Sequence, residues 1–164
     1  MKASDIMTRE VVTIDGAATV AEASQLMKRS GVRALIVNRI NEADAYGIVS
    51  ETDIIQKVVA IGANPQQVKV GAVMTKPCIV VNPGLAVEYI AGLFTRAGIC
   101  RAPVVRDKLL GIISVTDLLA LDNFRAQLQF KNAHSLLKQL EELEREESPL
   151  EVLPTDVYDA WCSG

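Results

Sequence analysis

Histidine, cysteine and aromatic residues are scarce in this sequence, and their scarcity excludes several kinds of site. The 164 residues include one histidine, His134, three cysteines and only 4% aromatic residues. Cys78, Cys100 and Cys162 form no C-x-x-C pair, so the close ligand spacing of a metal site is missing. A single histidine and no glycine-rich phosphate loop leave none of the common catalytic constellations. We therefore expect no enzyme, no metal site and no required cofactor.

Long apolar runs and an excess of positive charge are also missing. No hydrophobic stretch approaches the ~20 residues that span a bilayer, and the start, MKASDIMTRE, lacks the apolar core of a signal peptide. The formal net charge of −3 argues against a nucleic-acid or membrane surface that acts by bulk electrostatics. We expect a soluble cytoplasmic protein with no nucleic-acid or membrane partner.

Aliphatic residues, in contrast, are plentiful. Apolar residues make up 49% of the chain, and with so few aromatics the core must be built from Val, Ile, Leu and Ala. This composition favours the α/β class of helix-and-sheet proteins. Cys78 and Cys100 lie in apolar, strand-like runs and are interpreted as small core residues.

One nine-residue string occurs twice, as GIVSETDII (residues 47–55) and GIISVTDLL (residues 111–119). In each copy the β-branched residues favour a strand, and the aspartate suits the first turn of a following helix. Serine, threonine and aspartate then lie close together at a strand-to-helix junction, where α/β proteins usually place ligands. A carboxylate beside a hydroxyl can bind the vicinal diol of a ribose. The alternative is that serine and aspartate only cap a helix, which two near-identical copies make less attractive.

The repeat extends well beyond this string, with a period of about 65 residues. Each unit begins with a Met-Thr pair, so that Met7 matches Met74, and continues into an extended run at residues 11–14 or 78–81. A helix then ends at Gly31 or Gly98, and an apolar strand follows at residues 33–37 or 101–105. The loop before the first string is about four residues longer than its counterpart, as surface loops tolerate.

This order of elements, carried twice, resembles the tandem cystathionine-β-synthase (CBS) domain pair, or Bateman module. The resemblance covers about residues 1–121 and rests on the Met-Thr pairs, the helices, the RAPVV-type strand and the G-h-h-S-x-T-D string, called the signature below. It implies two pseudo-symmetric repeats of strand, helix, two strands and helix, placed at residues 1–66 and 67–121. A C-terminal helical extension follows at residues 122–164. The resemblance also implies a homodimer and two clefts that bind an adenosine ligand, namely AMP, ADP or ATP, or alternatively S-adenosylmethionine.

The same resemblance implies that each cleft takes apolar walls from one repeat and ribose-binding polar residues from the other. The first cleft has walls from Val11, Val12, Thr13, Val32 and Ala34 and is closed by Ser114, Thr116 and Asp117. The second cleft has walls from Pro77, Cys78, Ile79, Cys100 and Ala102 and is closed by Ser50, Thr52 and Asp53. Aliphatic walls suit the faces of an adenine, and backbone groups can bond its edge.

Arg33 and Arg101 match positions at which the family often places basic residues for phosphate. Counted from Gly31 and Gly98, however, they sit one position apart. On regular strands their side chains would then face opposite ways, unless a bulge restores equivalence. The alternative for each arginine is a surface ion pair.

The C-terminal segment has a different pattern. Leucines at helical spacing in residues 124–147 predict a helix with an acidic end, EELEREE, although two heptads are too few to indicate a coiled coil. This helix would cover the edge of the pair or a dimer mate. Beyond Pro149 and Pro154, the tail is either a flexible end or a docking peptide.

The function that the resemblance implies is an adenine-nucleotide-binding regulatory module that controls a partner or its own oligomer. Two alternatives stay open. One is a regulator that binds a thioredoxin-type enzyme, with the C-terminal extension contacting that partner. The other is a structural dimerisation scaffold without ligand, against which the intact serine, threonine and aspartate of both signatures argue.

Overall fold

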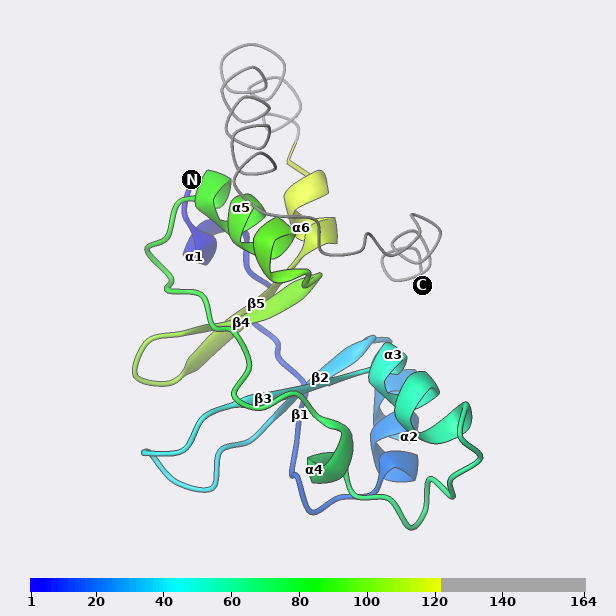
Figure 1. Ribbon diagram of the computed structural model, residues 1–164. Helices are drawn as coiled ribbons and strands as arrows, with labels where there is room; N and C mark the ends of the chain where they lie inside the picture. Colours follow the sequence, from blue (N-terminus) through cyan, green and yellow to red (C-terminus); the bar gives the residue numbers. More distant parts are fainter. Residues whose placement is uncertain (122–164) are drawn as a thin grey trace, which may run out of the picture. The chain divides into compact units, whose positions relative to one another are not determined.

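The computed structural model describes residues 1–121, and the predicted α/β class is confirmed (Figure 1). The chain divides into two bodies, residues 1–113 and 114–164, and each is described by itself. The predicted C-terminal helix and tail lie outside the described residues.

The first repeat contributes the following elements to the first body: β1 (Thr13–Ile14), α2 (Val20–Ser30), β2 (Ala34–Val37), β3 (Gly47–Ser50), α3 (Glu51–Ile54) and the π-helix η1 (Ile55–Val59). The second repeat contributes α5 (Val87–Ala97), β4 (Arg101–Val105) and β5 (Leu109–Ser114). Two single-turn helices, α1 (Ala3–Ile6) and α4 (Val70–Val73), each precede a Met-Thr pair. The second body opens with α6 (Val115–Leu119).

The three strands of the first repeat form one sheet in the order β1-β2-β3. β1 runs parallel to β2, and β2 runs antiparallel to β3 with Ala34 opposite Ser50. All four residues of central β2 are buried, whereas β3 alternates buried and half-buried positions. β4 and β5 form a separate two-stranded sheet.

Helices α2 and α5 end where the sequence predicts. Gly31 and Gly98 follow them with φ angles of 66° and 62°, in the left-handed region that glycine adopts without steric cost. At the start of α2, Thr19 and Glu22 form a capping box, in which each side chain accepts a hydrogen bond from the other residue's backbone N–H.

The first extended run of each repeat is shorter than the sequence predicts. Of residues 11–14 only the last two form a strand, β1. Residues 78–81 form no strand and contribute only a parallel bridge between Val81 and Val104. In the first repeat Ile36 N–H donates to Val12 O, but the matching residue of the second repeat is Pro103, which has no N–H to donate to Ile79; Cys78 N–H donates to Tyr46 O. This run therefore bonds the residue that precedes β3 at one end, through Cys78, and β4 at the other end, through Val81.

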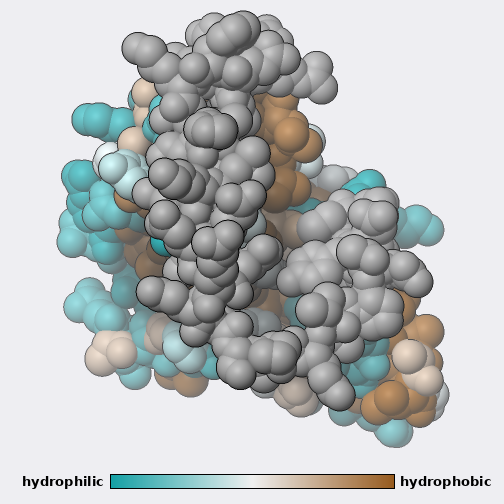
Figure 2. All heavy atoms as spheres, turned by 45° about the horizontal axis from the view of Figure 1, so that its top comes forward, coloured by the Kyte–Doolittle hydropathy of each residue, from teal (hydrophilic) through white to brown (hydrophobic). Residues whose placement is uncertain are grey.

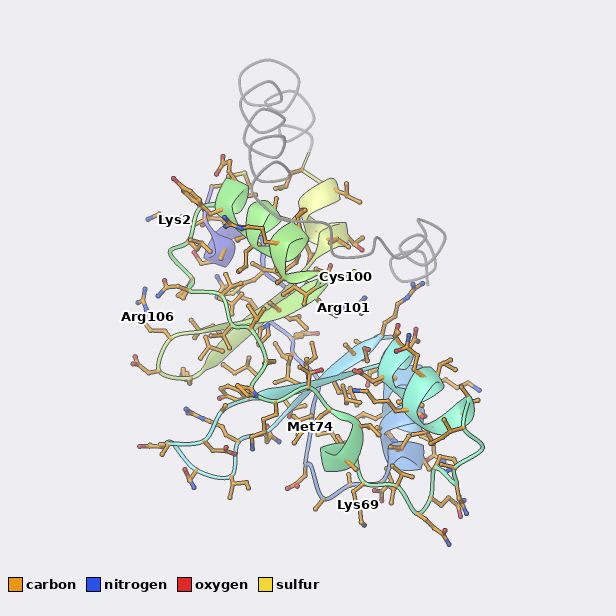
Figure 3. All side chains as sticks on the ribbon, viewed as in Figure 1. Lys2, Lys69, Met74, Cys100, Arg101 and Arg106 are labelled. Atoms are coloured by element: carbon orange, nitrogen blue, oxygen red, sulfur yellow. The ribbon has the colours of Figure 1, made fainter. Side chains whose placement is uncertain are left out.

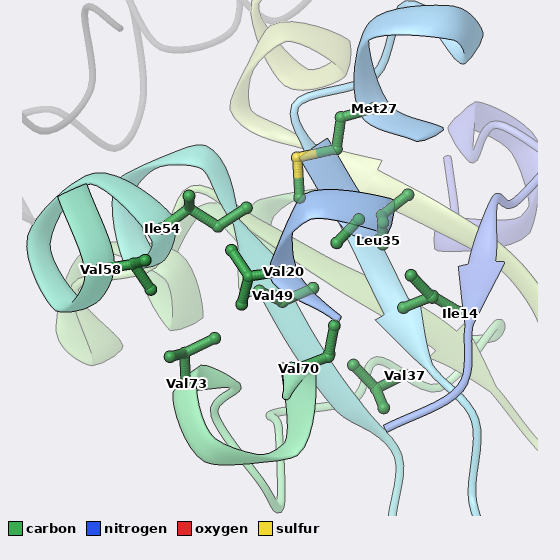
Figure 4. Close-up of a cluster of buried hydrophobic side chains, with 11 residues drawn as sticks. Ile14, Val20, Met27, Leu35, Val37, Val49, Ile54, Val58, Val70 and Val73 are labelled. Atoms are coloured by element: carbon green, nitrogen blue, oxygen red, sulfur yellow. The ribbon is translucent and has the colours of Figure 1, made fainter. Parts of the chain in front are cut away.

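A core of aliphatic side chains lies between the sheet of the first repeat and its helices (Figure 4). Val20, Leu35 and Val49 have no accessible surface, and they come from α2, β2 and β3 respectively. Burial of one such side chain contributes about 1.5–3 kcal/mol to stability. Val70 and Val73 of α4 belong to the same core, although they follow the first repeat's helices in sequence.

The N-terminal segment joins the second repeat instead of the first. Ala3 N–H donates to Leu85 O (2.8 Å), and Ser4 N–H donates to Pro83 O (3.0 Å). These bonds hold α1 beside α5, as Figure 1 shows for the blue and green ribbons. In the matching positions of the other repeat, Val70 N–H donates to Ala18 O (2.9 Å). Each repeat is thus completed by a segment that precedes the opposite repeat in sequence.

The Met-Thr pairs also pack on the opposite repeat, where they contact the strand of the signature. Thr8 forms an antiparallel bridge with Ile112 of β5, and Thr75 forms one with Ile48 of β3. A Cβ atom on Gly111 would lie 2.7 Å from Met7 Sδ and 2.8 Å from Thr8 O. The glycine of the signature is therefore required because the crossing segment packs directly on the strand.

Hydrophobic side chains interrupt the hydrophilic surface of the described residues (Figure 2). The large apolar residues with more than half of their surface exposed are Met1, Ile40, Ile55, Val59, Ile61, Tyr89 and Leu119.

Candidate functional site

The first signature forms a capping box where β3 ends and α3 begins. Ser50 is the N-cap residue, and both its N–H (2.9 Å) and its Oγ (3.0 Å) donate to Asp53 Oδ2. In return, Asp53 N–H donates to Ser50 Oγ (3.2 Å). The spacing S-x-x-D places the carboxylate in the third helical position, where it satisfies a backbone donor that the helix leaves open.

The second signature repeats this geometry between β5 and α6. Ser114 N–H and Oγ donate to Asp117 Oδ2 at 2.7 and 2.8 Å, and Asp117 N–H donates to Ser114 Oγ at 3.3 Å. The helix-cap interpretation of serine and aspartate is therefore correct for both copies as far as these bonds go. Capping does not use every polar atom of the aspartate, because each box involves only one of the two carboxylate oxygens.

Groups that a ligand can use remain at both junctions. The second carboxylate oxygen, Oδ1, of Asp117 has no hydrogen-bond partner within residues 1–121. The hydroxyls of Thr52 and Thr116 also have none there, and the two threonines are half-buried and exposed respectively. A carboxylate oxygen next to a hydroxyl can accept from and donate to a vicinal diol. Each serine hydroxyl already donates its one proton within the cap, so the threonine hydroxyl is the donor that remains for a ligand at each junction.

Asp53 differs from Asp117 in the surroundings of its Oδ1 atom. Lys57 Nζ, on the π-helical turn η1, donates to that oxygen at 3.1 Å and to Val73 O at 2.8 Å. The side chains of Lys57 and Asp53 are 44% and 18% exposed. Four residues after Asp117, the second repeat has Leu121, which carries no charge.

The residues predicted as cleft walls differ in how far their side chains are exposed to solvent. Ile79 is 40% exposed, Pro77 is exposed and Cys78 is half-buried, whereas Ala102 has no accessible surface. Val11, Val12, Thr13 and Val32 are half-buried, and Ala34 is buried. Among these, the structure joins Ala34 to Ser50 of the same repeat as strand partners. The contribution of each wall residue to a ligand cleft stays a prediction.

Arg33 and Arg101 occupy different positions in their repeats. Ile14 pairs with Val37 in the first repeat, and Val81 pairs with Val104 in the second, so no bulge corrects the offset between the arginines. Arg33 precedes β2 and is exposed, whereas Arg101 opens β4 and is half-buried (Figure 3). Within residues 1–121, neither arginine forms an ion pair. Both guanidinium groups are thus free to bind an anion in that part of the chain.

Cys78 and Cys100 are both half-buried, so they lie at the margin of the core and not within it. Burial raises the pKa of the Cys78 thiol, which keeps it protonated and unreactive near neutral pH. Cys100 adjoins Arg101 at the start of β4 (Figure 3).

Residues 1–121 hold no group of three or more His, Cys, Asp or Glu side chains arranged to ligate a metal ion. None of the helices in this range has the length and apolar character that crossing a membrane requires.

Two features of the site were missed by sequence reasoning. One is Lys57, which the spacing D-x-x-x-K would have indicated as a partner for Asp53 on a helix. The other is the exchange of N-terminal segments, which brings Thr75 to β3 and Thr8 to β5. No local pattern indicates that exchange, because the sequence alone does not show on which repeat's strand a Met-Thr pair packs.

Comparison with known proteins gives consistent matches. The profile of the CBS domain matches residues 3–60 and 70–123. A solved hexameric CBS-CP12 protein from bloom-forming cyanobacteria is 47% identical, with a TM-score of 0.76 over 88% of this chain and 85% of that one. The CBS domain protein PAE2072 from Pyrobaculum aerophilum, complexed with AMP, is 22% identical and shares the fold, with a TM-score of 0.69 over 79% and 98% of the two chains.

An uncharacterised protein of Methanopyrus kandleri is 32% identical over 123 residues. The match includes 73% of this chain but only 62% of the archaeal protein, so this chain spans less than two thirds of that relative.

Proposed function

Because the chain belongs to the CBS domain family, we propose that it is a regulatory module that binds an adenine nucleotide, AMP, ADP or ATP, without catalysing a reaction. The observation that carries the proposal is the pair of signatures, each with a threonine hydroxyl and a carboxylate at a strand-to-helix junction. The AMP complex of the Pyrobaculum aerophilum protein, which has the same fold, supports this ligand class. S-adenosylmethionine, which also carries an adenosine, is the alternative ligand.

The proposal assigns distinct roles to the predicted site residues. Thr52 with Asp53, and Thr116 with Asp117, bind ribose hydroxyls, while Ser50 and Ser114 hold the carboxylates in place. Arg33 and Arg101 bind phosphate, since both guanidinium groups lack an ion pair among the described residues. The apolar residues predicted at the walls bury the faces of the adenine.

The output of the module passes through its own assembly or another protein. The hexameric state of the 47% identical CBS-CP12 protein supports an oligomer, for which a homodimer is the smallest unit that we propose. In this proposal residues 1–66 and 67–121 are the two repeats, and residues 122–164 contact a protein partner. A cytoplasmic location is part of the same proposal.

Calorimetric titration tests the ligand. AMP, ADP, ATP, S-adenosylmethionine and adenosine are titrated in turn into the full chain, and at least one adenine nucleotide is expected to bind with a micromolar dissociation constant. Ligand at a hundred times that constant should stabilise the folded protein by about 2.7 kcal/mol, which a thermal melt detects. Absence of heat and of any melting shift at millimolar ligand would contradict the proposal and favour the scaffold alternative.

The variant Asp117→Asn separates ligand binding from helix capping. The amide oxygen can still accept the Ser114 hydrogen bonds, but the negative charge offered to a ribose hydroxyl is lost. We expect affinity to fall about ten- to hundredfold with little change in melting temperature. Unchanged affinity together with a lower melting temperature would show that Asp117 serves the cap alone.

A further inference from the structure

Four residues after the signature aspartate, the two repeats differ at a position that bears directly on the carboxylate oxygen left over by the cap. Asp53 Oδ1 accepts a hydrogen bond from Lys57 Nζ at 3.1 Å, whereas Asp117 Oδ1 has no partner within residues 1–121. The residue that corresponds to Lys57 is Leu121, which cannot form such a bond.

Lys57 is held in this position by more than its ion pair. Its Nζ atom also donates to Val73 O, at the end of α4, with a distance of 2.8 Å. An exposed ion pair between residues i and i+4 is weak and easily displaced when it stands alone. A second hydrogen bond, to a carbonyl that the last turn of a helix leaves open, fixes the ammonium group beside Asp53.

The backbone under Lys57 is unusual as well. η1 is the π-helix of the described residues, and Ala60 N–H closes it by donating to Ile55 O at 2.8 Å. π-helical turns are rare and often occur at functional sites, and this one carries the lysine that bonds Asp53.

We infer that Lys57 is a specificity-determining residue that makes the two signatures unequal, so that Asp117 binds a ribose diol more tightly than Asp53 does. This inference rests on the proposed function, since it concerns the same ligand class. A diol that approaches Asp53 must compete with an ammonium group already bonded to the available oxygen. At Asp117 the corresponding oxygen can accept from the diol without displacing anything in the described part of the chain.

Exchange of the two residues provides the test. Calorimetric titrations with adenosine and with AMP are carried out on the full chain, on Lys57→Met and on Leu121→Lys. The parent is expected to show two unequal sites or a single detectable one. Lys57→Met should strengthen the weaker site by about three- to tenfold, because methionine keeps the length of the side chain without the charge. Leu121→Lys should weaken the stronger site by a similar factor.

Three further variants assign the sites and control for charge. In the Lys57→Met background, Asp53→Asn should remove the strengthened site, whereas Asp117→Asn should remove the other. Lys76→Met, which deletes a lysine from a different ion pair, with Asp44, should leave both sites as in the parent. Lys57→Gln replaces Lys57→Met if thermal melts show that the latter fails to fold.

The outcomes separate this inference from the function on which it rests. Absence of binding by the parent and by every variant overturns both. Two equal sites in the parent, or no response to Lys57→Met, overturn the inference and leave nucleotide binding intact. Weaker AMP binding by Lys57→Met with unchanged adenosine binding would also overturn it, because Lys57 would then be a phosphate ligand.

Discussion

The two copies of the signature have the same internal geometry but different surroundings. In each copy the serine and the aspartate exchange the same three hydrogen bonds, at 2.9, 3.0 and 3.2 Å in the first and 2.7, 2.8 and 3.3 Å in the second. Beyond this box the copies diverge: only the first has a lysine bonded to its aspartate among the described residues. The comparison shows that the same cap can leave a carboxylate oxygen without a partner among residues 1–121 in one copy and bonded to a lysine in the other.

A second contrast concerns the loops between the paired strands. Residues 38–46 join β2 to β3, whereas only residues 106–108 join β4 to β5. The longer loop is ordered by its own polar contacts: Arg39 lies over the Tyr46 ring, 4.9 Å from its centroid, and donates to Asp107 O. Lys76 Nζ bonds Asp44 Oδ2 at 2.6 Å. The insertion is thus tied to the chain that follows the first repeat.

The largest expected effect comes from the signature glycines. A Cβ at Gly111 would meet the backbone oxygen of Thr8 at 2.8 Å, whereas one at Gly47 would meet the side-chain sulfur of Met74 at 2.9 Å. Because a backbone atom cannot move aside as a methionine can, Gly111→Ala should destabilise the fold by about 2–3 kcal/mol and Gly47→Ala by about 1 kcal/mol.

Thermal melts compare these variants with Gly92→Ala as the control. Gly92 lies within α5, and the nearest atom to an added Cβ is Arg96 Nη2 at 4.0 Å. That substitution should raise stability by about 0.5–1 kcal/mol, since alanine favours a helix interior. Equal losses of stability for Gly47→Ala and Gly111→Ala would contradict this prediction, because the two crossing segments would then move aside equally easily.

A smaller effect is expected from the arginines, and it sharpens the contrast between the repeats. Arg101 is half-buried on β4, whereas Arg33 is exposed, so a phosphate bound by Arg101 is less screened by water. Arg101→Ala should weaken AMP binding about tenfold and Arg33→Ala about threefold, while adenosine binding stays nearly constant. Titrations with AMP and adenosine measure both. A parallel loss for the two ligands would instead assign the arginines a structural role.

The smallest expected effect is on the pH dependence of stability, through Asp44 of the longer loop. The hydrogen bond from Lys76, followed by that from Ile40 N–H, holds the pKa of Asp44 below its ordinary value. A lowered folded-state pKa contributes stability that is complete above the unfolded pKa and is lost as the pH falls through the folded pKa. Lys76→Met should therefore raise the pKa of Asp44 and shift this loss to higher pH. Carboxyl NMR titration of the parent and the variant detects the change, and an unaltered Asp44 titration would contradict it.

The local features of the fold were predictable, and the long-range ones were not. Gly31 and Gly98 mark the ends of α2 and α5 because a left-handed residue is a property of the turn itself. The S-x-x-D spacing likewise specifies a capping box within four residues. Residues 78–81 match residues 11–14 in register, as predicted, but they form no strand, because the facing Pro103 on another strand has no N–H to donate.

The candidate site shows the same division. The sequence indicates the threonine, aspartate and arginine residues of both repeats, and it also predicts the offset between Arg33 and Arg101 that the strand pairing retains. It does not indicate which aspartate has a lysine bonded to its second carboxylate oxygen among residues 1–121. That depends on Lys57 reaching both Asp53 and Val73 O, and Val73 is sixteen residues further along the chain.

The crossing of α1 and α4 has a consequence for how the protein can be divided. A piece cut between the sequence repeats, at residues 66 and 67, would carry residues 1–8 without their partner Ile112 and would lack Thr75, the partner of its own β3. The other piece would have the complementary deficit. Neither fragment would be a self-sufficient domain, but each would present an open strand edge that the other fills. The two fragments should therefore recover their fold when they are mixed, and should not fold when they are kept apart.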